Sequence, residues 1–526
     1  MNKIVGFLIT PKEQKIFPDF FQRGLKTVHL TNPFYNIYLW GIGNILLCKC
    51  SDKYSLSFPL HDNLLDRNVL VNIKTDKITI ENDWLGSIPV FFNNKQLIVS
   101  TLPINCLHEK NIHSEGLNNF FEFGYCVFGQ TPFKNIKFMR FLSKLVIHDN
   151  RIEIVYKDDP VLDNKIFRKN STVEKTFTLI KDYMTKADSK LNGDIILPLS
   201  GGYDSRLINY FVSDKSKIRS FTYGVSKRQS KSIEVLYARK VAEILGTKWK
   251  QIELKHSYKY IDDWFRLYGF STHLHGMYHI EFYKKIVESI QSNNCSFLSG
   301  IVGDAWAGRI VYRPIEDYHH VINLGYTHGI NIDLTYLKMR TDHLLKKNFF
   351  KEYKNYLIDD RIKIIFTIRL KIMLISYLTQ IPEYLGFPVW TPFLNYEIAM
   401  AMLNLPESSR KNRQWQTDFF KRVGLNIEDM GINVNLSNTL DYNLTLNNQL
   451  DLINVDVMAD FIEKERLLEI NKRLCKIGIG KKIKNEILNL PKVSGLLKKV
   501  RITNDYLTSL LYEYFIIKAI EKSITY

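Results

Sequence analysis

The feature that most constrains the fold of this chain is a glycine turn between an apolar run and a helical segment. The turn spans residues 199–206, with the sequence LSGGYDSR, and it follows the apolar run 195–197. Leu207, Ile208 and Phe211 then recur at helical spacing. A short buried strand, a tight turn and a helix in this order are typical of a βαβ unit, which builds a parallel sheet.

The same alternation continues on both sides of the turn. Helical patterns occupy 172–187 and 233–245, and strand-like apolar runs occupy 195–197, 218–223, 249–254 and 296–298. These segments predict a parallel, Rossmann-like sheet flanked by helices. Beyond about residue 335 the pattern is largely helical.

The N-terminal part has a different pattern. Up to about residue 160, short β-branched and aromatic runs are separated by Asn, Asp, Gly and Pro, which is typical of a layered, β-rich domain. The segment 157–172 is polar and contains Pro160. The sequence therefore predicts an α/β protein with two domains, 1–160 and 165–526.

The glycine turn also predicts chemistry. Gly201 and Gly202 allow a sharp bend and a close approach of the backbone to a ligand. The helix that follows directs free N–H groups at the turn, and the hydroxyls of Ser200 and Ser205 add donors, so that the segment resembles a phosphate-binding nest. Asp204 would repel an anion there unless Mg²⁺ bridges it to phosphate oxygens. The Lys of a Walker A loop is missing.

Composition narrows the class of protein. The chain has 526 residues, of which 45% are hydrophobic, so a disordered or fibrous protein is excluded. The longest apolar stretch, 364–378, is interrupted by Arg369 and Lys371, so we expect no membrane span. The N-terminus lacks the pattern of a secretion signal, and the six cysteines are scattered, so we expect a cytoplasmic protein without a disulfide framework. The net charge of +18 favours acidic partners.

Around these residues the chain resembles the PP-loop ATP pyrophosphatase superfamily and, within it, the asparagine synthetase-like branch with β-lactam synthetase and the lasso-peptide cyclases. Further segments carry the resemblance in family order: 81–92 (ENDWLGSIPVFF), 121–136 (FEFGYCVFGQTPFKNI), 220–224 (SFTYG), 241–247 (VAEILGT), 299–304 (SGIVGD) and 391–395 (TPFLN). They cover roughly residues 80–410.

The resemblance implies an N-terminal domain that is similar to Ntn-hydrolase glutaminases, followed by a PP-loop synthetase domain. It implies ATP and Mg²⁺ as cofactors, adenylation of a carboxylate with release of pyrophosphate, and transfer of the acyl group to a nitrogen nucleophile. Asp204 and Asp304 would share Mg²⁺ and act in catalysis. The residues that would hold ATP are Leu199, Ser200, Gly201, Gly202, Asp204, Ser205, Tyr223, Ser299 and Gly300.

The sequence departs from the family in three places. Asn2 stands where glutamine-hydrolysing members have Cys, so we expect an inactive glutaminase domain. Ile301 stands where asparagine synthetases have Glu, which argues against aspartate as substrate. The family's C-terminal Lys has no clear equivalent. Lys476 is one candidate for it, and Glu383 is a candidate acid or base from its position before the 391–395 segment.

Several alternatives stay open at this point. The substrate is expected to be a small-molecule, sugar or peptide carboxylate, because the basic residues between Lys464 and Arg501 suit an acidic substrate. Asparagine synthesis from free ammonia is one alternative, and a PP-loop enzyme that modifies RNA is another, although a nucleic-acid partner is disfavoured because RNA-modifying relatives lack the N-terminal domain. The sequence gives no oligomeric state and does not say whether the product is cyclic.

Overall fold

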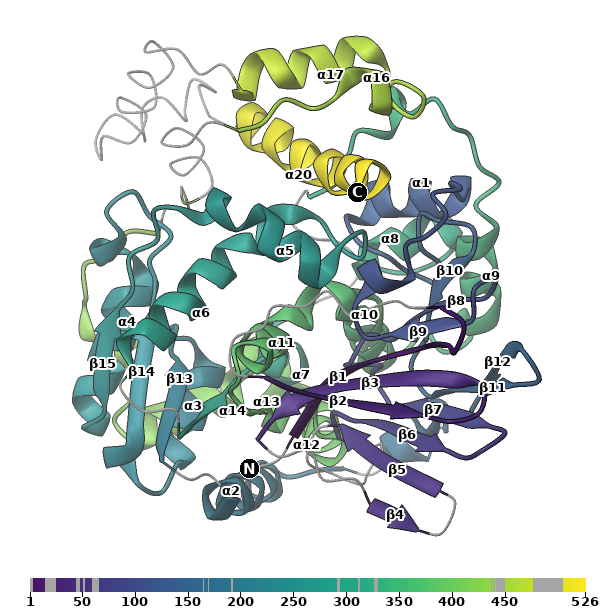
Figure 1. Cartoon of the computed structure of the whole chain (residues 1–526). Coiled ribbons are helices and arrows are strands. Elements are labelled where there is room, and N and C mark those ends of the chain that lie inside the picture. The colour runs from purple at the N-terminus through teal and green to yellow at the C-terminus, as the bar shows by residue number, and fades with distance from the viewer. Residues whose placement is uncertain are drawn as a thin grey trace.

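The fold contains three sheets, two antiparallel and one parallel, in a computed structural model of the chain (Figure 1). The antiparallel sheets belong to the N-terminal region, and the parallel sheet and most helices follow it. The structure describes residues 3–14, 25–43, 48–50, 53–58, 66–163, 165–168, 170–190, 193–290, 294–310, 313–325, 330–436, 438, 440, 450–475 and 505–526.

The two antiparallel sheets pack face to face. The first has the strand order β10-β8-β9-β1-β3-β2 and the second β12-β11-β7-β6-β5-β4. Alternate side chains, such as Phe7, Leu39, Val71 and Ile80, are fully buried between them, which is the period-two pattern of a strand with one face on a core. The strands are β1 (Lys3–Pro11), β2 (Lys26–Thr31), β3 (Tyr35–Ile42), β4 (Cys48–Cys50), β5 (Lys53–Phe58), β6 (Val69–Ile73), β7 (Ile78–Asn82), β8 (Phe91–Asn93), β9 (Ile98–Ser100), β10 (Ile136–Phe138), β11 (Ser143–His148) and β12 (Arg151–Tyr156).

The third sheet is parallel and has the order β15-β14-β13-β16-β17. After β13 the chain adds β14 and β15 on one side, then returns to add β16 and β17 on the other. Loops that leave β13 and β16 therefore diverge from one crevice at the carboxyl edge, where parallel sheets bind ligands. The strands are β13 (Asp194–Pro198), β14 (Ile218–Thr222), β15 (Lys248–Gln251), β16 (Cys295–Leu298) and β17 (Val389–Trp390).

Helices cover the parallel sheet and make up most of the described residues beyond 335, as predicted (Figure 1). They are α1 (Ser114–Phe123), α2 (Val173–Lys190), α3 (Tyr203–Phe211), α4 (Ile233–Leu245), α5 (Ile261–Tyr268), α6 (Tyr278–Ser289), α7 (Gly303–Ala307), α8 (Ile322–Gly325), α9 (Leu344–Tyr353), α10 (Asp360–Ile375), α11 (Tyr377–Tyr384), α12 (Tyr396–Leu403), α13 (Glu407–Arg410), α14 (Gln414–Arg422), α16 (Val455–Met458), α17 (Lys464–Ile470) and α20 (Asp505–Thr525).

One helical stretch, Asp360–Tyr384, has the length and apolar composition of a membrane-crossing helix. About 72% of its most apolar window is buried inside the fold, which is also how the core helix of a globular domain behaves. It contains α10 and α11, and Figure 1 shows both in the interior of the molecule, between the parallel sheet and the antiparallel sheets.

The N-terminal and C-terminal regions share a core. Trp84, which follows β7, is fully buried among residues of the later region, and its indole N–H donates to the Leu394 carbonyl oxygen at 2.9 Å. Its ring centroid lies 5.9 Å from that of Trp306 on α7. The proposed division into 1–160 and 165–526 stays a prediction, but Trp84 is a core residue of the second region.

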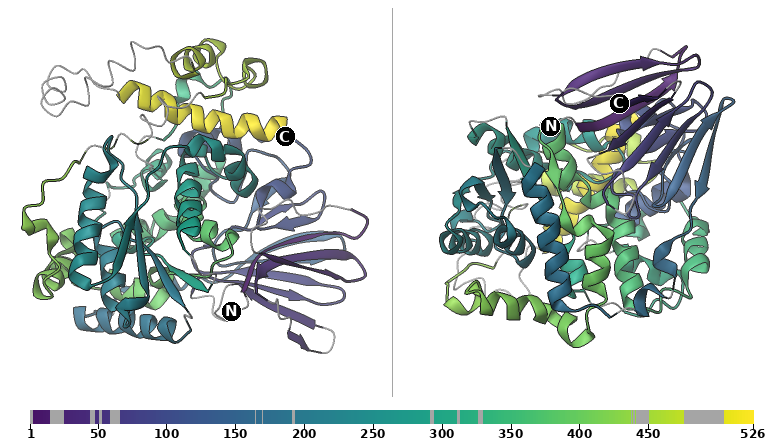
Figure 2. Two further views of the ribbon diagram at one scale, coloured as in Figure 1. Left: turned by 60° about the vertical axis from the view of Figure 1, so that its left-hand side comes forward. Right: turned by 90° about the horizontal axis from the view of Figure 1, so that it is seen from below.

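Buried ion pairs reinforce this contact. Arg67 forms two hydrogen bonds to Glu383, at 2.7 and 2.8 Å, and both side chains are almost fully buried. Arg369 on α10 pairs with Asp159 at 2.5 Å and donates through Nε to the Trp84 carbonyl oxygen at 3.0 Å. Removing one partner of such a pair leaves an uncompensated buried charge, which is strongly destabilising. Figure 2 shows the antiparallel sheets packed along one side of the helical region.

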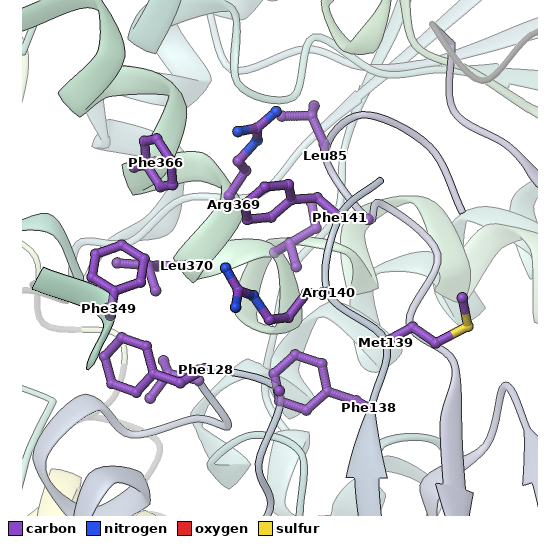
Figure 3. A pocket seen from close by; sticks show the side chains of 14 residues that line it. Leu85, Phe128, Phe138, Met139, Arg140, Phe141, Phe349, Phe366, Arg369 and Leu370 are labelled. Carbon is purple, nitrogen blue, oxygen red and sulfur yellow. The ribbon is translucent and has the colours of Figure 1, made fainter. Parts of the chain in front are cut away.

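A small cavity lies in the same contact (Figure 3). Its volume is about 30 Å³, room for about one water molecule. The Arg369 guanidinium lies 3.8 Å from the centroid of the Phe141 ring, and Arg140 faces the aromatic rings of the lining. None of the residues predicted to bind ATP or Mg²⁺ lines this cavity. It is part of the contact between the regions, apart from the predicted site.

Candidate active site

The glycine turn lies at the carboxyl end of β13, in the crevice of the parallel sheet. Gly201 has φ +72°, and a Cβ atom there would overlap Tyr237 and Ala238 of α4. Glycine is therefore required both by the backbone and by the close packing of the turn against α4. Gly202 is the N-cap of α3, so the turn leads directly into the positive end of a helix.

The polar groups of the turn bond one another only loosely. Ser200 N–H donates to Ser205 Oγ at 3.3 Å, the two hydroxyls are 3.4 Å apart, and Gly202 N–H lies 3.3 Å from Ser200 Oγ. These distances are at the long limit for hydrogen bonds. Ser200 and Gly202 are exposed. The turn therefore offers several donors that a stronger acceptor, such as a phosphate oxygen, can recruit.

A second loop, which follows β16, packs against the first. A Cβ atom on Gly300 would lie 3.1 Å from Asp204 Cβ, and one on Gly303 would lie 2.6 Å from Asp204 Cγ. Val302 between them has φ +61°, a conformation that is rare for a β-branched residue. This strained turn places Asp304 at the start of α7, next to the Asp204 carboxylate.

The two carboxylates therefore lie together, and this environment changes the ionisation of Asp204. Burial, and then repulsion by Asp304, raises the pKa of Asp204 to about 8. Arg413 opposes this shift. Arg309 lies 3.3 Å from Asp304, on the more exposed side of the pair. Two acids that share one small site are a common feature of catalytic and metal-binding centres.

Sequence reasoning missed a third titratable group. Lys371 on α10 is half-buried, and the desolvation of its ammonium group lowers its pKa to about 8, while the neighbouring Asp304 carboxylate opposes that shift. The sequence shows Lys371 only as a charge that interrupts an apolar helix. A lysine within such a run is itself a signal, because a buried amine needs a carboxylate or an anionic ligand near it.

The carboxylate pair offers oxygen ligands of the kind that Mg²⁺ prefers. Among the described residues, buried Oδ1 of Asp204 has no hydrogen-bond partner, although it lies beside Asp304 and the glycine turn. The described part of the chain contains no group of three or more His, Cys, Asp or Glu side chains arranged for a metal. Mg²⁺ commonly uses one or two carboxylates together with substrate phosphates, so this pair fits Mg²⁺ bound with a nucleotide.

Four other residues that the resemblance assigns to ATP binding lie near the glycine turn. Leu199 lies beside β14, with its N–H donating to Phe221, while Tyr223 directly follows β14 and its ring packs against Phe282 and His279. Ser299 and Gly300 are half-buried in the second loop. These residues share the carboxyl edge of the sheet with the glycine turn. Their contacts with ATP stay predictions.

Glu383 and Lys476 are placed differently. Glu383 lies buried in its ion pair with Arg67 of the N-terminal region, which gives it a structural role in joining the two regions. A role as acid or base stays a prediction, and the described contacts do not connect it with Asp204 or Asp304. Lys476 lies outside the described residues.

Enlarging Gly303 is expected to disturb the carboxylate pair without unfolding the protein. In Gly303→Ala, the new methyl group would occupy the position of the Asp204 carboxyl group and displace it. A displacement of about 1 Å can reduce turnover about a hundredfold. Magnesium-dependent ATP consumption and circular dichroism of the same samples check this. Unchanged ATP consumption would show that the Asp204 carboxyl group is free to move.

A comparison with known protein families finds a match in the part of the chain that contains the glycine turn. Residues 194–268 match the asparagine synthase family. The match begins at β13 and contains the glycine turn, Asp204 and Tyr223. No curated protein matches the chain. The chain therefore carries an asparagine synthase family domain at residues 194–268, the part that forms the glycine turn and one half of the carboxylate pair.

Proposed function

We propose that this protein is an ATP-dependent ligase that adenylates a carboxylate and transfers the acyl group to a nitrogen nucleophile, forming an amide with release of AMP and pyrophosphate. The observation that carries the proposal is the Asp204–Asp304 pair beside the phosphate-binding turn. An asparagine synthase domain implies an enzyme that uses ATP for adenylation. The two acids lie in the crevice where such a sheet binds its nucleotide.

The first step fits the charges of the site. A carboxylate oxygen of the substrate attacks the α-phosphorus, and the bond from this phosphorus to the oxygen of the β-phosphate breaks with release of pyrophosphate. Donors of the glycine turn and the N-terminus of α3 bind the departing phosphates. Asp204 and Asp304 would hold Mg²⁺, which neutralises charge on the phosphate oxygens when bound.

In the second step the nitrogen attacks the activated acyl carbon, AMP leaves with the electron pair of the broken bond, and the nitrogen loses a proton to solvent or to a base. Asn2 supplies no thiol for glutamine hydrolysis, so ammonia or a substrate amine is the proposed nucleophile. Ile301 cannot pair with an ammonium group, and its buried side chain lies at the turn before Asp304. We therefore propose an acyl substrate other than aspartate.

Three cations next to the acids favour an acidic acyl substrate. Lys371 and Arg309 flank Asp304, and Arg413 acts on Asp204. With Mg²⁺ bound to the acids, these side chains would be available to additional negative charge. A sugar uronate, an acidic peptide or another small carboxylate suits this environment.

Magnesium-dependent exchange of labelled pyrophosphate into ATP tests the proposal, with aspartate, uronic acids and peptides as separate substrates. We expect exchange with one class other than aspartate. Absence of exchange with every carboxylate, together with AMP release in the presence of RNA, would move the protein to the RNA-modifying alternative. Exchange with aspartate and amide formation from ammonia would instead support asparagine synthesis.

We expect that the protein does not take nitrogen from glutamine. Incubation with glutamine should release no glutamate above the uncatalysed rate, because residue 2 is asparagine and cannot form the nucleophilic thiolate. Ammonia or an added amine should support amide formation in the presence of the accepted carboxylate. ATP-independent release of glutamate by the purified protein would contradict the loss of glutaminase chemistry.

A further inference from the structure

We propose that Arg206 is a positioning residue, which fixes the orientation of the Gly201–Gly202 peptide so that the turn can bind pyrophosphate. The inference rests on the proposed function and concerns a side chain that the sequence analysis left without a role. Arg206 lies on α3, is fully buried, and donates through Nη2 to the Gly201 carbonyl oxygen at 2.5 Å.

The effect on the turn follows from peptide geometry. In a planar trans peptide the carbonyl and the following N–H point in opposite directions. Holding the Gly201 carbonyl oxygen on the Arg206 side therefore directs the Gly202 N–H to the opposite side. That side is where Ser200 Oγ lies, 3.3 Å from the Gly202 nitrogen, within the exposed part of the turn.

The turn needs an external constraint of this kind. Two consecutive glycines rotate more freely than any other pair, so the peptide between them can reverse at little cost. The hydrogen bonds inside the turn are long, at 3.3 to 3.4 Å, and therefore weak. The 2.5 Å contact from a charged guanidinium is the shortest bond that the structure describes to this peptide.

Arg206 is itself held rigidly. Its Nη1 donates to the Leu425 carbonyl oxygen at 2.9 Å, and Glu428 accepts from Nη1 at 3.0 Å and from Nη2 at 2.8 Å. The guanidinium lies 5.0 and 4.9 Å from the ring centroids of Tyr203 and Phe420. A planar guanidinium can donate to all of these acceptors at the same time, whereas a lysine ammonium cannot. Glu428 thus holds Arg206 in place, and Arg206 in turn holds the Gly201–Gly202 peptide.

Binding of magnesium pyrophosphate and of MgATP, measured by titration calorimetry, tests the inference. In Arg206→Lys we expect affinity for both ligands to fall at least about tenfold, the loss of about one charge-assisted hydrogen bond. In Glu428→Gln, which keeps one acceptor oxygen, we expect a smaller decrease. In the exchange assay, KM for ATP should rise in the same order, while KM for the carboxylate should change less than about twofold.

A matched control separates positioning from general destabilisation. Arg466 donates through Nε and Nη2 to Glu513 at 2.9 and 2.6 Å and is likewise buried, but it joins α17 to α20. Arg466→Lys should lower the melting temperature without changing the affinity for pyrophosphate. If Arg206→Lys does not fold, Glu428→Gln decides the question.

The outcomes distinguish this inference from the proposed function. Failure of the unaltered protein to bind either ligand would overturn both. Normal binding by the unaltered protein together with equal binding by Arg206→Lys and Glu428→Gln would overturn the positioning role alone. A parallel decrease in all three arginine and glutamate variants would also overturn it, since it would report stability rather than peptide orientation.

Discussion

Replacing Asp204 with asparagine is expected to abolish ATP–pyrophosphate exchange while making the protein more stable at neutral and alkaline pH. The loss of activity, about a thousandfold or more, is expected because the proposed magnesium site would lose the Asp204 carboxylate, which would ionise when the metal binds. The gain in stability follows from the same carboxylate, because burial and the neighbouring Asp304 raise its pKa from 3.8 to about 8.

The raised pKa of Asp204 determines how the stability of the folded protein changes with pH. Between about pH 4 and pH 8 the folded protein retains a proton on Asp204 that the unfolded chain releases, so stability decreases as pH rises through this window. Asparagine cannot ionise, so the Asp204→Asn protein does not undergo this loss of stability. The melting temperature of Asp204→Asn should therefore equal that of the unaltered protein near pH 4 and exceed it by at least about 2 °C at pH 8.

Asp214→Asn is the control for this experiment. Asp214 is exposed, and hydrogen bonds from Ser216 lower its pKa, so its ionised form is favoured in the folded protein. Its replacement should produce no gain in melting temperature at pH 8 and no loss of exchange. A melting temperature of Asp204→Asn that stays below that of the unaltered protein at every pH would contradict the raised pKa of Asp204.

Replacing Trp84 with alanine is expected to destabilise the whole protein by about 3–5 kcal/mol. Trp84 is fully buried between the two regions and contacts both α7 and the segment before α12. Its loss leaves a cavity beneath the helix that carries Asp304 and an unpaired carbonyl group at Leu394. Exchange activity should fall together with the thermal midpoint, which differential scanning calorimetry measures.

Two further variants separate the contribution of the Trp84 hydrogen bond and provide a control for the loss of an aromatic ring. Trp84→Phe keeps most of the ring volume and loses the hydrogen bond to Leu394, so it should cost about 1 kcal/mol. Phe34→Ala removes an exposed aromatic side chain of the same region and should change stability by less than about 0.5 kcal/mol. Equal midpoints for Trp84→Ala and Phe34→Ala would show that the two regions do not support each other.

Local patterns predicted the parallel sheet because each signal lies within a short segment. The run before Ser200 indicates β13, the glycine turn indicates the start of α3, and helical spacing indicates α4. The two-residue strand β17, Val389–Trp390, was missed, because two residues show no periodicity.

The arrangement of the site was harder to predict, because it depends on contacts between distant residues. Asp204 meets Asp304, and Asp304 meets Lys371, only after the chain has passed through several helices, and the raised pKa of Asp204 depends in part on the first of these contacts. Glu383 was a candidate acid or base from its position in the sequence alone. Its burial against Arg67, which lies 316 residues away, has no local signature.

The burial of Trp84 has a consequence for recombination. A crossover at 160–165 would take Trp84 and Asp159 from one parent and their partners Leu394 and Arg369 from the other. Chimeras joined there would inherit mismatched halves of a single interior, even where each half came from a working parent. Decay of an N-terminal activity can therefore proceed by substitution, but deletion of the segment that carries Trp84 would remove the support of α7.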